Sequence, residues 1–404
     1  MQMVSFRWNS LGYSAAAVFG FLRFTIVAIV VGPEQVGELA IAMSMFTVLV
    51  AVSGFGVRQL YVSGRLNKIV LQCSSLVDAV WFTQVALCTV VVVFGAVVTS
   101  IASIIGMHSN ALYMAFGLTL CLLPLSLHNV VMLEDEMKGD FKRISIIEAS
   151  SQTVSTVFLC LMTFVFISPW LLVISRMFQA VLGMSLSYSI SPVRKMERVR
   201  LSDVLSILKV GKPVLKINIA TFITQGFDKL VLSFFVSNDI IGFYYTAQRV
   251  VDVPLGIYVQ VMTRSLLPEQ NRRYTEKGLS IIQDDSVIVY RSVFIYVAAI
   301  IIALFVAWRI DANYSVLGEW ALIYPLVYFV VGIAYMRACC QLISPMLMVI
   351  GKVELDSKMK IQECVVYLPA LIIFSYLFGL YGVLFVSFIL YFVSAVRRHN
   401  EFMR

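Results

Sequence analysis

The sequence predicts an all-α polytopic membrane protein of about 12 transmembrane helices, arranged as two parallel six-helix lobes around a central cavity. Of its 404 residues, 60% are hydrophobic and only 13% are charged, whereas a soluble domain has roughly 25% charged residues. Apolar runs of roughly 20 residues, long enough to cross a bilayer as a helix, recur throughout the chain. A short stretch of the first half also recurs at the corresponding place in the second half.

The apolar runs are continuous, and this decides what kind of span they form. Inside lipid every backbone N–H and C=O must be paired within the protein, so a span is either a helix or a strand of a closed barrel. Barrel strands alternate apolar and polar residues, which these runs do not. The helices expected in the first half lie at about 9–31, 37–60, 79–104, 111–133, 146–167 and 170–190. Those expected in the second half lie at about 211–236, 243–267, 288–308, 319–347, 362–379 and 382–396.

The positively charged residues indicate how the chain is oriented. Lys and Arg collect in cytoplasmic loops, and 21 of the 31 fall in loops on the side of the N-terminus, while the opposite loops contain only Arg309. We therefore expect both termini in the cytoplasm. The formal net charge of +8 reflects the same asymmetry, so it gives no reason to expect a nucleic acid as partner.

A repeat divides the chain near its middle. The stretch Val31–Gly37 aligns with Val236–Gly242 at an offset of 205 residues, and in both copies an acidic residue lies three positions before the glycine. Each copy is the expected outer turn between the first two helices of its half. Because an even number of spans separates them, the halves are parallel repeats about an axis along the membrane normal. The predicted domains are an N-terminal six-helix lobe (1–190), a cytoplasmic linker rich in Lys and Arg (191–212) and a C-terminal six-helix lobe with a short tail (213–404).

Several charged residues lie inside the expected spans. A charge near the bilayer centre costs at least ~2.5 kcal/mol, so by default it faces a partner or a wet cavity. Arg23 lies well inside the first helix, and the repeat offset places it at the depth of Asp228 and Lys229 in the seventh. We expect these three residues to meet across the cavity. The further candidate cavity residues are Arg249, Arg58, Lys216, Arg176 and Arg337.

This predicted interior is mainly basic, and two interpretations of it remain open. A basic, water-filled cavity suits an anionic headgroup, because the arginine guanidinium is a planar fork of donors that matches phosphate oxygens in pairs. Alternatively, the same side chains extend to the membrane interface or form structural ion pairs, for instance Arg23 with Asp228.

Two groups of residues carry a resemblance to a known family. In the second half they are Asp228-Lys229-Leu230-Val231-Leu232, Ile241-Gly242-Phe243-Tyr244-Tyr245, Ala247 and Arg249. In the first half they are Val31-Gly32-Pro33-Glu34, Gly37, Gly54-Phe55-Gly56 and Arg58. Both groups resemble the Wzx-type polysaccharide (O-antigen) flippases of the multidrug/oligosaccharidyl-lipid/polysaccharide (MOP) exporter superfamily.

The resemblance implies a fold, a function and a location. The fold is MOP flippase-like. The function is to translocate an undecaprenyl-pyrophosphate-linked oligosaccharide repeat unit from the cytoplasmic to the periplasmic leaflet of the bacterial inner membrane, for O-antigen or other surface polysaccharide synthesis. The implied partners are this lipid-linked glycan and membrane lipid, with a polysaccharide polymerase and chain-length proteins as further candidates.

Other function classes are less compatible with the sequence. A drug or cation antiporter of the same superfamily, the alternative, predicts an acidic residue in the cavity of the first lobe, where this chain has Arg23. The outer loops, of about ten residues or fewer, leave no room for a catalytic domain, so no enzyme is expected. No Walker-type motif and no metal-ligand spacing occur, so the sequence predicts neither ATP hydrolysis nor a cofactor or metal. Coupling is then left to the membrane potential or to exchange with H⁺ or Na⁺.

Overall fold

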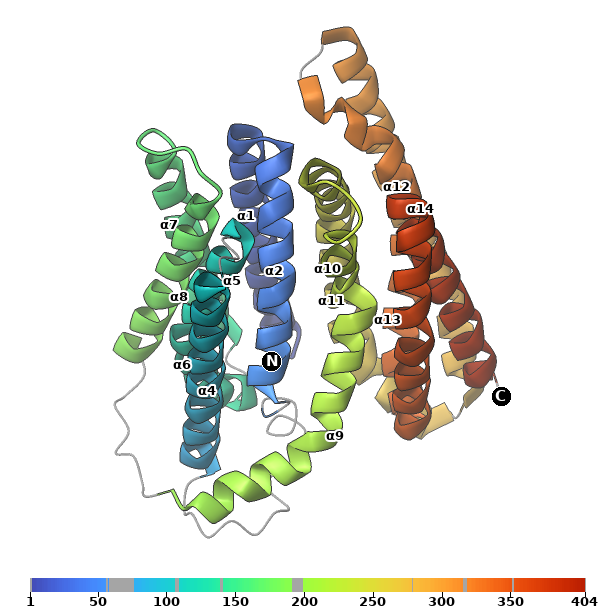
Figure 1. Cartoon of the computed structure of the whole chain (residues 1–404). Helices are drawn as coiled ribbons and strands as arrows, with labels where there is room; N and C mark the ends of the chain where they lie inside the picture. Colours follow the sequence, from blue (N-terminus) through green and yellow to red (C-terminus); the bar gives the residue numbers. More distant parts are fainter. Residues whose placement is uncertain are drawn as a thin grey trace. The chain divides into compact units, whose positions relative to one another are not determined.

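The structure is a computed structural model, and all the regular secondary structure in its described part is helical (Figure 1). The described residues are 2–55, 57, 76–105, 109–138, 141–190, 199–277, 279–314, 318–350 and 352–403. The first half contains α1 (Gln2–Val31), α2 (Pro33–Gly54), α4 (Leu76–Ile104), α5 (Asn110–Leu120), α6 (Leu122–Lys138), α7 (Phe141–Met162) and α8 (Trp170–Ile190). The second half contains α9 (Leu201–Gly226), α10 (Asp228–Leu232), α11 (Asn238–Lys277), α12 (Leu279–Tyr314), the 3₁₀ helix η2 (Gly318–Leu322), α13 (Ile323–Val349) and α14 (Val353–Met403).

Each of the twelve expected spans overlaps one or more of these helices, which confirms the predicted all-α membrane fold. Within the described residues, nine helices are long and apolar enough to cross a bilayer. One of these, α14, contains two of the expected spans. The expected spans at 211–236 and 243–267 correspond to α9 with α10 and to α11.

The helices form two compact units, each with its own interior. The first unit comprises Met1–Gly32 and Glu38–Gly226, and the second comprises Pro33–Gly37 and Phe227–Arg404. In the first unit α1 packs against α7, and α8 packs against α6 and α7. In the second unit α13 packs against both α11 and α14. The domain boundaries expected from the sequence, with a linker at 191–212, stay a prediction.

The repeated turn packs against its own copy inside the second unit. A Cβ atom added to Gly37 would lie 1.8 Å from the backbone oxygen of Asn238, and one added to Gly242 would lie 1.9 Å from the backbone oxygen of Pro33. The offset of 205 pairs Gly37 with Gly242 and Pro33 with Asn238, so the two contacts are equivalent under the repeat. Glycine is required at both positions because no side chain fits between the two backbones.

The last helix folds back on itself as two antiparallel arms. Gly379 interrupts α14 with φ 57° and ψ −131°, a conformation that favours glycine. Arg398 of the second arm reaches back to the first arm, where its Nη1 and Nη2 atoms donate to Glu363 at 2.8 and 3.0 Å and its Nε donates to Asp356 at 3.0 Å. Asp356 also accepts a hydrogen bond of 2.5 Å from Ser344 of α13. These charges are therefore paired and tie α13 to both arms of α14.

Candidate functional site

Arg23 is the most deeply buried cation in the described part of the first unit. Its side chain is on α1, with 2% of the residue exposed. The guanidinium donates to Ser155 at 2.9 Å and to Gln152, both on α7, and to Gln179 of α8 at 2.8 Å. All three acceptors are neutral, so hydrogen bonds orient the guanidinium without neutralising its charge.

The Nε–H group of this guanidinium has no partner among the described residues. The buried Nε of Arg23 makes no hydrogen bond, and no acidic side chain in the described part of the chain forms an ion pair with Arg23. A second cation, Arg176 of α8, lies near enough for its charge to act on Arg23. It is three residues before Gln179, which places both side chains on one face of α8. Arg23 is therefore a buried cation in a polar site whose hydrogen-bond acceptors for it are all neutral.

Asp228 and Lys229 are the centre of a second polar cluster, in the second unit. Lys229 Nζ lies 2.9 Å from Asp228 Oδ1, and both residues are buried. The other carboxylate oxygen of Asp228 accepts hydrogen bonds from the Tyr244 hydroxyl at 2.6 Å and from Gln248 Nε2 at 3.0 Å. The Lys229 ammonium lies 5.6 Å and 5.8 Å from the ring centroids of Tyr244 and Tyr245. The carboxylate and the ammonium are thus both held by α11.

α11 also carries Arg249 and Asp252, two further charged residues of this unit. One turn beyond Tyr245, Arg249 directs its Nε and Nη2 atoms at the Tyr245 hydroxyl at 3.0 and 2.6 Å. Asp252 forms an ion pair with Arg337 of α13. Around α11 the described residues therefore include the ion pairs Lys229–Asp228 and Arg337–Asp252, with Arg249 beside Tyr245.

The eight predicted cavity residues are distributed as follows. The structure places Arg23 and Arg176 together in the first unit, and Asp228 and Lys229 together in the second unit, where Arg249 and Arg337 also lie. Lys216 is exposed on α9, and Arg58 lies outside the described residues. The expectation that Arg23 meets Asp228 and Lys229 across a cavity stays a prediction.

The sequence interpretation missed the neutral partners of these charges. Gln152 and Ser155 are three residues apart on α7, and Tyr244 and Gln248 are four apart on α11. Such spacings place each pair on one helix face. Amide and hydroxyl side chains repeated at helical spacing within apolar spans were the signal available in the sequence.

Comparisons with known proteins agree with this fold. The family model of polysaccharide biosynthesis proteins matches residues 26–279, more than half of the chain. A comparison with curated protein sequences gave no match. Among solved structures, an inward-facing multidrug resistance MATE family transporter of the MOP superfamily superposes with a TM-score of 0.70 at 14% identity, over 96% of this chain and 94% of that one.

Two further solved structures resemble the chain over nearly its whole length. A mutant of the Vibrio cholerae MATE transporter VcmN gives a TM-score of 0.64 at 12% identity, over 99% of this chain and 95% of that one. The eukaryotic MATE transporter AtDTX14 gives 0.61 at 13% identity, over 98% and 97%. At such identities the likeness establishes the fold alone. The chain therefore has the fold of MOP-superfamily transporters and, as its resemblance to the Wzx-type flippases predicted, belongs to the polysaccharide biosynthesis protein family.

Proposed function

We propose that this multi-pass membrane protein is a flippase for a lipid-linked oligosaccharide. Its substrate is an undecaprenyl-pyrophosphate-linked repeat unit, which it moves from the cytoplasmic to the periplasmic leaflet of the bacterial inner membrane for O-antigen or other surface polysaccharide synthesis. It acts as a transporter and not as an enzyme. The family of the chain supports the involvement in polysaccharide synthesis.

The observation that carries this proposal is the environment of Arg23. A charged side chain inside a membrane helix costs roughly 2.5–3.5 kcal/mol on insertion scales. Where the role is structural, a neighbouring carboxylate usually offsets part of that cost. The three partners of Arg23 are neutral and its Nε makes no hydrogen bond, so Arg23 keeps its positive charge for an anionic ligand.

A pyrophosphate is the anion that suits this cluster. The guanidinium binds phosphate oxygens through directed pairs of N–H groups. Gln152 and Gln179 hold it in one orientation, which lowers the entropy lost when the anion binds. The same amide side chains also carry donors for sugar hydroxyls. The site therefore has chemistry for both parts of a glycan–pyrophosphate headgroup.

Transport by this mechanism needs no ATP. An inside-negative potential drives an anion outward by ~2.3 kcal/mol per charge per 100 mV. A pyrophosphate carried without its cations is therefore driven toward the periplasm, and exchange with H⁺ or Na⁺ supplies the alternative. On this proposal both termini are cytoplasmic, and a polysaccharide polymerase with its chain-length proteins receives the product.

The test is deletion of the gene in its host strain, followed by complementation and analysis of surface polysaccharide and lipid-linked intermediates. We expect loss of polymer, accumulation of lipid-linked repeat units on the cytoplasmic side, and rescue by the wild-type chain but not by Arg23→Ala. Arg309→Ala is the matched control, because Arg309 is an exposed arginine of α12 stacked near Phe305 and Trp308. Normal polymer in a deletion strain without a second flippase would reject the proposal and favour a drug or cation antiporter.

A further inference from the structure

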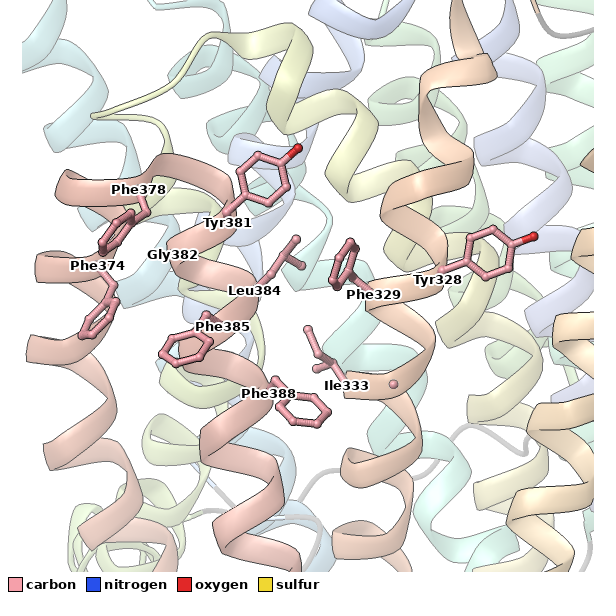
Figure 2. A pocket seen from close by; sticks show the side chains of 11 residues that line it. Tyr328, Phe329, Ile333, Phe374, Phe378, Tyr381, Gly382, Leu384, Phe385 and Phe388 are labelled. Atoms are coloured by element: carbon pink, nitrogen blue, oxygen red, sulfur yellow. The ribbon is translucent and has the colours of Figure 1, made fainter.

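The second unit contains an apolar cavity whose lining includes no residue of either polar cluster. Its volume is about 730 Å³, within the ~300–1,000 Å³ typical of small-molecule sites. It lies between α13 and the two arms of α14, and its lining is almost entirely aromatic and aliphatic (Figure 2). Figure 2 shows Phe329 of α13 facing Leu384 of α14 across it, with the ring of Phe388 below Ile333.

Glycines shape the packing of the helices around this cavity. The break at Gly379 starts the second arm of α14, and three residues later a Cβ on Gly382 would lie 2.0 Å from the backbone oxygen of Phe374. On α13, a Cβ on Gly332 would point at the ring of Phe388 from 3.8 Å. Gly382 therefore lets the two arms of α14 approach closely, while the missing side chain at Gly332 leaves space in front of the Phe388 ring.

The groove opens sideways. Its floor is buried, at Ile333 and Leu384, while its rim consists of exposed rings that include Phe329, Phe385 and Phe388. An exposed rim of large apolar rings on transmembrane helices is suited to contact with lipid, which would let a ligand enter this groove from the bilayer. Gly379 forms the turn at the end of α14 that is opposite its two termini. The groove is lined by residues near this turn, so it lies in the membrane leaflet on the Gly379 side.

The floor of the groove leads to the polar cluster of the same unit. Arg337, paired with Asp252, is one helical turn beyond Ile333 on α13. Ser387, whose hydroxyl lies 3.0 Å from that of Tyr367, is three residues beyond Leu384 on α14. An amphiphile with its chain in the groove would thus direct its headgroup toward the charged interior of this unit.

We propose that the groove binds the polyprenyl chain of the lipid-linked substrate, an assignment that rests on the proposed flippase function. An isoprenoid chain carries a methyl branch on every unit, so it is thicker than a straight acyl chain. It therefore contacts rings on both sides of a space that a straight chain fills only in part. Its alkene and methyl groups also pack favourably on aromatic faces. The groove holds the chain in the membrane while the headgroup occupies the protein interior.

The test measures binding of a polyprenyl chain to the full-length purified protein in nanodiscs of phosphatidylcholine and phosphatidylglycerol. The probe is undecaprenol with a photoreactive diazirine on the chain and no phosphate, so headgroup binding does not contribute. We expect labelled peptides from 328–333 and 374–388. Unlabelled undecaprenol should compete, whereas an excess of a straight-chain alcohol should not.

Two variants test the groove itself. Phe329→Ala/Phe385→Ala should lower labelling roughly fivefold to tenfold, because two ring contacts are lost. The matched control is Phe82→Ala/Phe94→Ala on α4, which removes two rings that are similarly exposed and should leave labelling unchanged. Gly332→Leu keeps every ring but fills the groove beside Phe388, and it should lower labelling by a similar factor.

Several outcomes would overturn the assignment. These are labelling spread evenly over the lipid-facing helices, equal competition by the straight-chain alcohol, or labelling unaffected by both groove variants. The binding assay is independent of transport. If lipid-linked units accumulate in the deletion strain but the groove is not labelled, only the groove assignment is overturned. If the groove is labelled but the deletion strain makes normal polymer, the flippase function is overturned, and with it the assignment of the polyprenyl chain as part of the substrate.

Discussion

Replacing Arg23 by methionine separates a functional from a structural role for this arginine. Methionine keeps an unbranched side chain of similar length but removes the charge and all five donors. The variant therefore deletes the hydrogen bonds to Ser155, Gln152 and Gln179 with little change in volume. It also leaves three acceptors that can rearrange, since Ser155 already donates to the backbone oxygen of Gln152.

The expected change in stability is small because two terms oppose each other. Interhelical hydrogen bonds inside a membrane contribute roughly 0.6 kcal/mol on average and at most about 1.7 kcal/mol each, so the loss of three amounts to roughly 2–5 kcal/mol. Removing an intramembrane charge returns roughly 2.5–3.5 kcal/mol. The net change in the free energy of unfolding should therefore stay within about 2.5 kcal/mol, while polysaccharide export in the complementation assay should be lost.

Equilibrium unfolding in mixed detergent micelles measures this change, and Arg398→Met is the matched comparison. Arg398 is as buried as Arg23, at 2% exposed, but it is paired with Asp356 and Glu363. Breaking a buried ion pair costs about 3–5 kcal/mol, so Arg398→Met should unfold far more easily. The reasoning is refuted if Arg23→Met loses as much stability as Arg398→Met, or if it exports polymer normally.

Two further predictions concern packing and pairing inside the second unit. Gly37→Ala and Gly242→Ala should each lower the free energy of unfolding by roughly 1–3 kcal/mol, and the double variant should lose less than the sum, because both substitutions disturb the same contact. The control is Gly256→Ala, whose added Cβ has nothing within 4 Å. It should raise the free energy of unfolding by up to about 1 kcal/mol in the same assay. Arg337→Met alone should lower the free energy of unfolding by about 3–5 kcal/mol, because it leaves Asp252 without its ion-pair partner. The double variant Arg337→Met/Asp252→Leu should recover most of this stability. An equal loss of stability in the single and double variants would contradict the pairing.

The helices could be predicted from the sequence because the signal for a span is local. An apolar run of sufficient length has few alternatives in a bilayer, so every expected span overlaps a helix of the described residues. The charge of Arg23 was also visible, since an arginine within an apolar run stands out. Its neighbours were not, because Gln152 and Gln179 become partners of Arg23 only when α7 and α8 pack beside α1.

Other features depend on backbone geometry that composition does not reveal. The expected span at 211–236 is divided into α9 and α10 at Phe227, without a proline at that point. Lys216 is exposed on α9, and its place in the cavity stays a prediction. The aromatic groove depends on the break in α14 at Gly379. The sequence does not show which residues of α13 and α14 face each other, so the groove and its width could not be predicted from it.

The contact between Gly37 and Gly242 has a consequence for the order of synthesis. Gly37 leaves the ribosome 205 residues before Gly242, which at ~5–20 residues per second is a delay of roughly 10–40 s. During that time the first turn has been threaded into the bilayer but lacks the backbone against which it packs. Two separately expressed pieces divided after Gly226 would therefore each remain incomplete, because residues 33–37 of one piece form part of the folded body of the other.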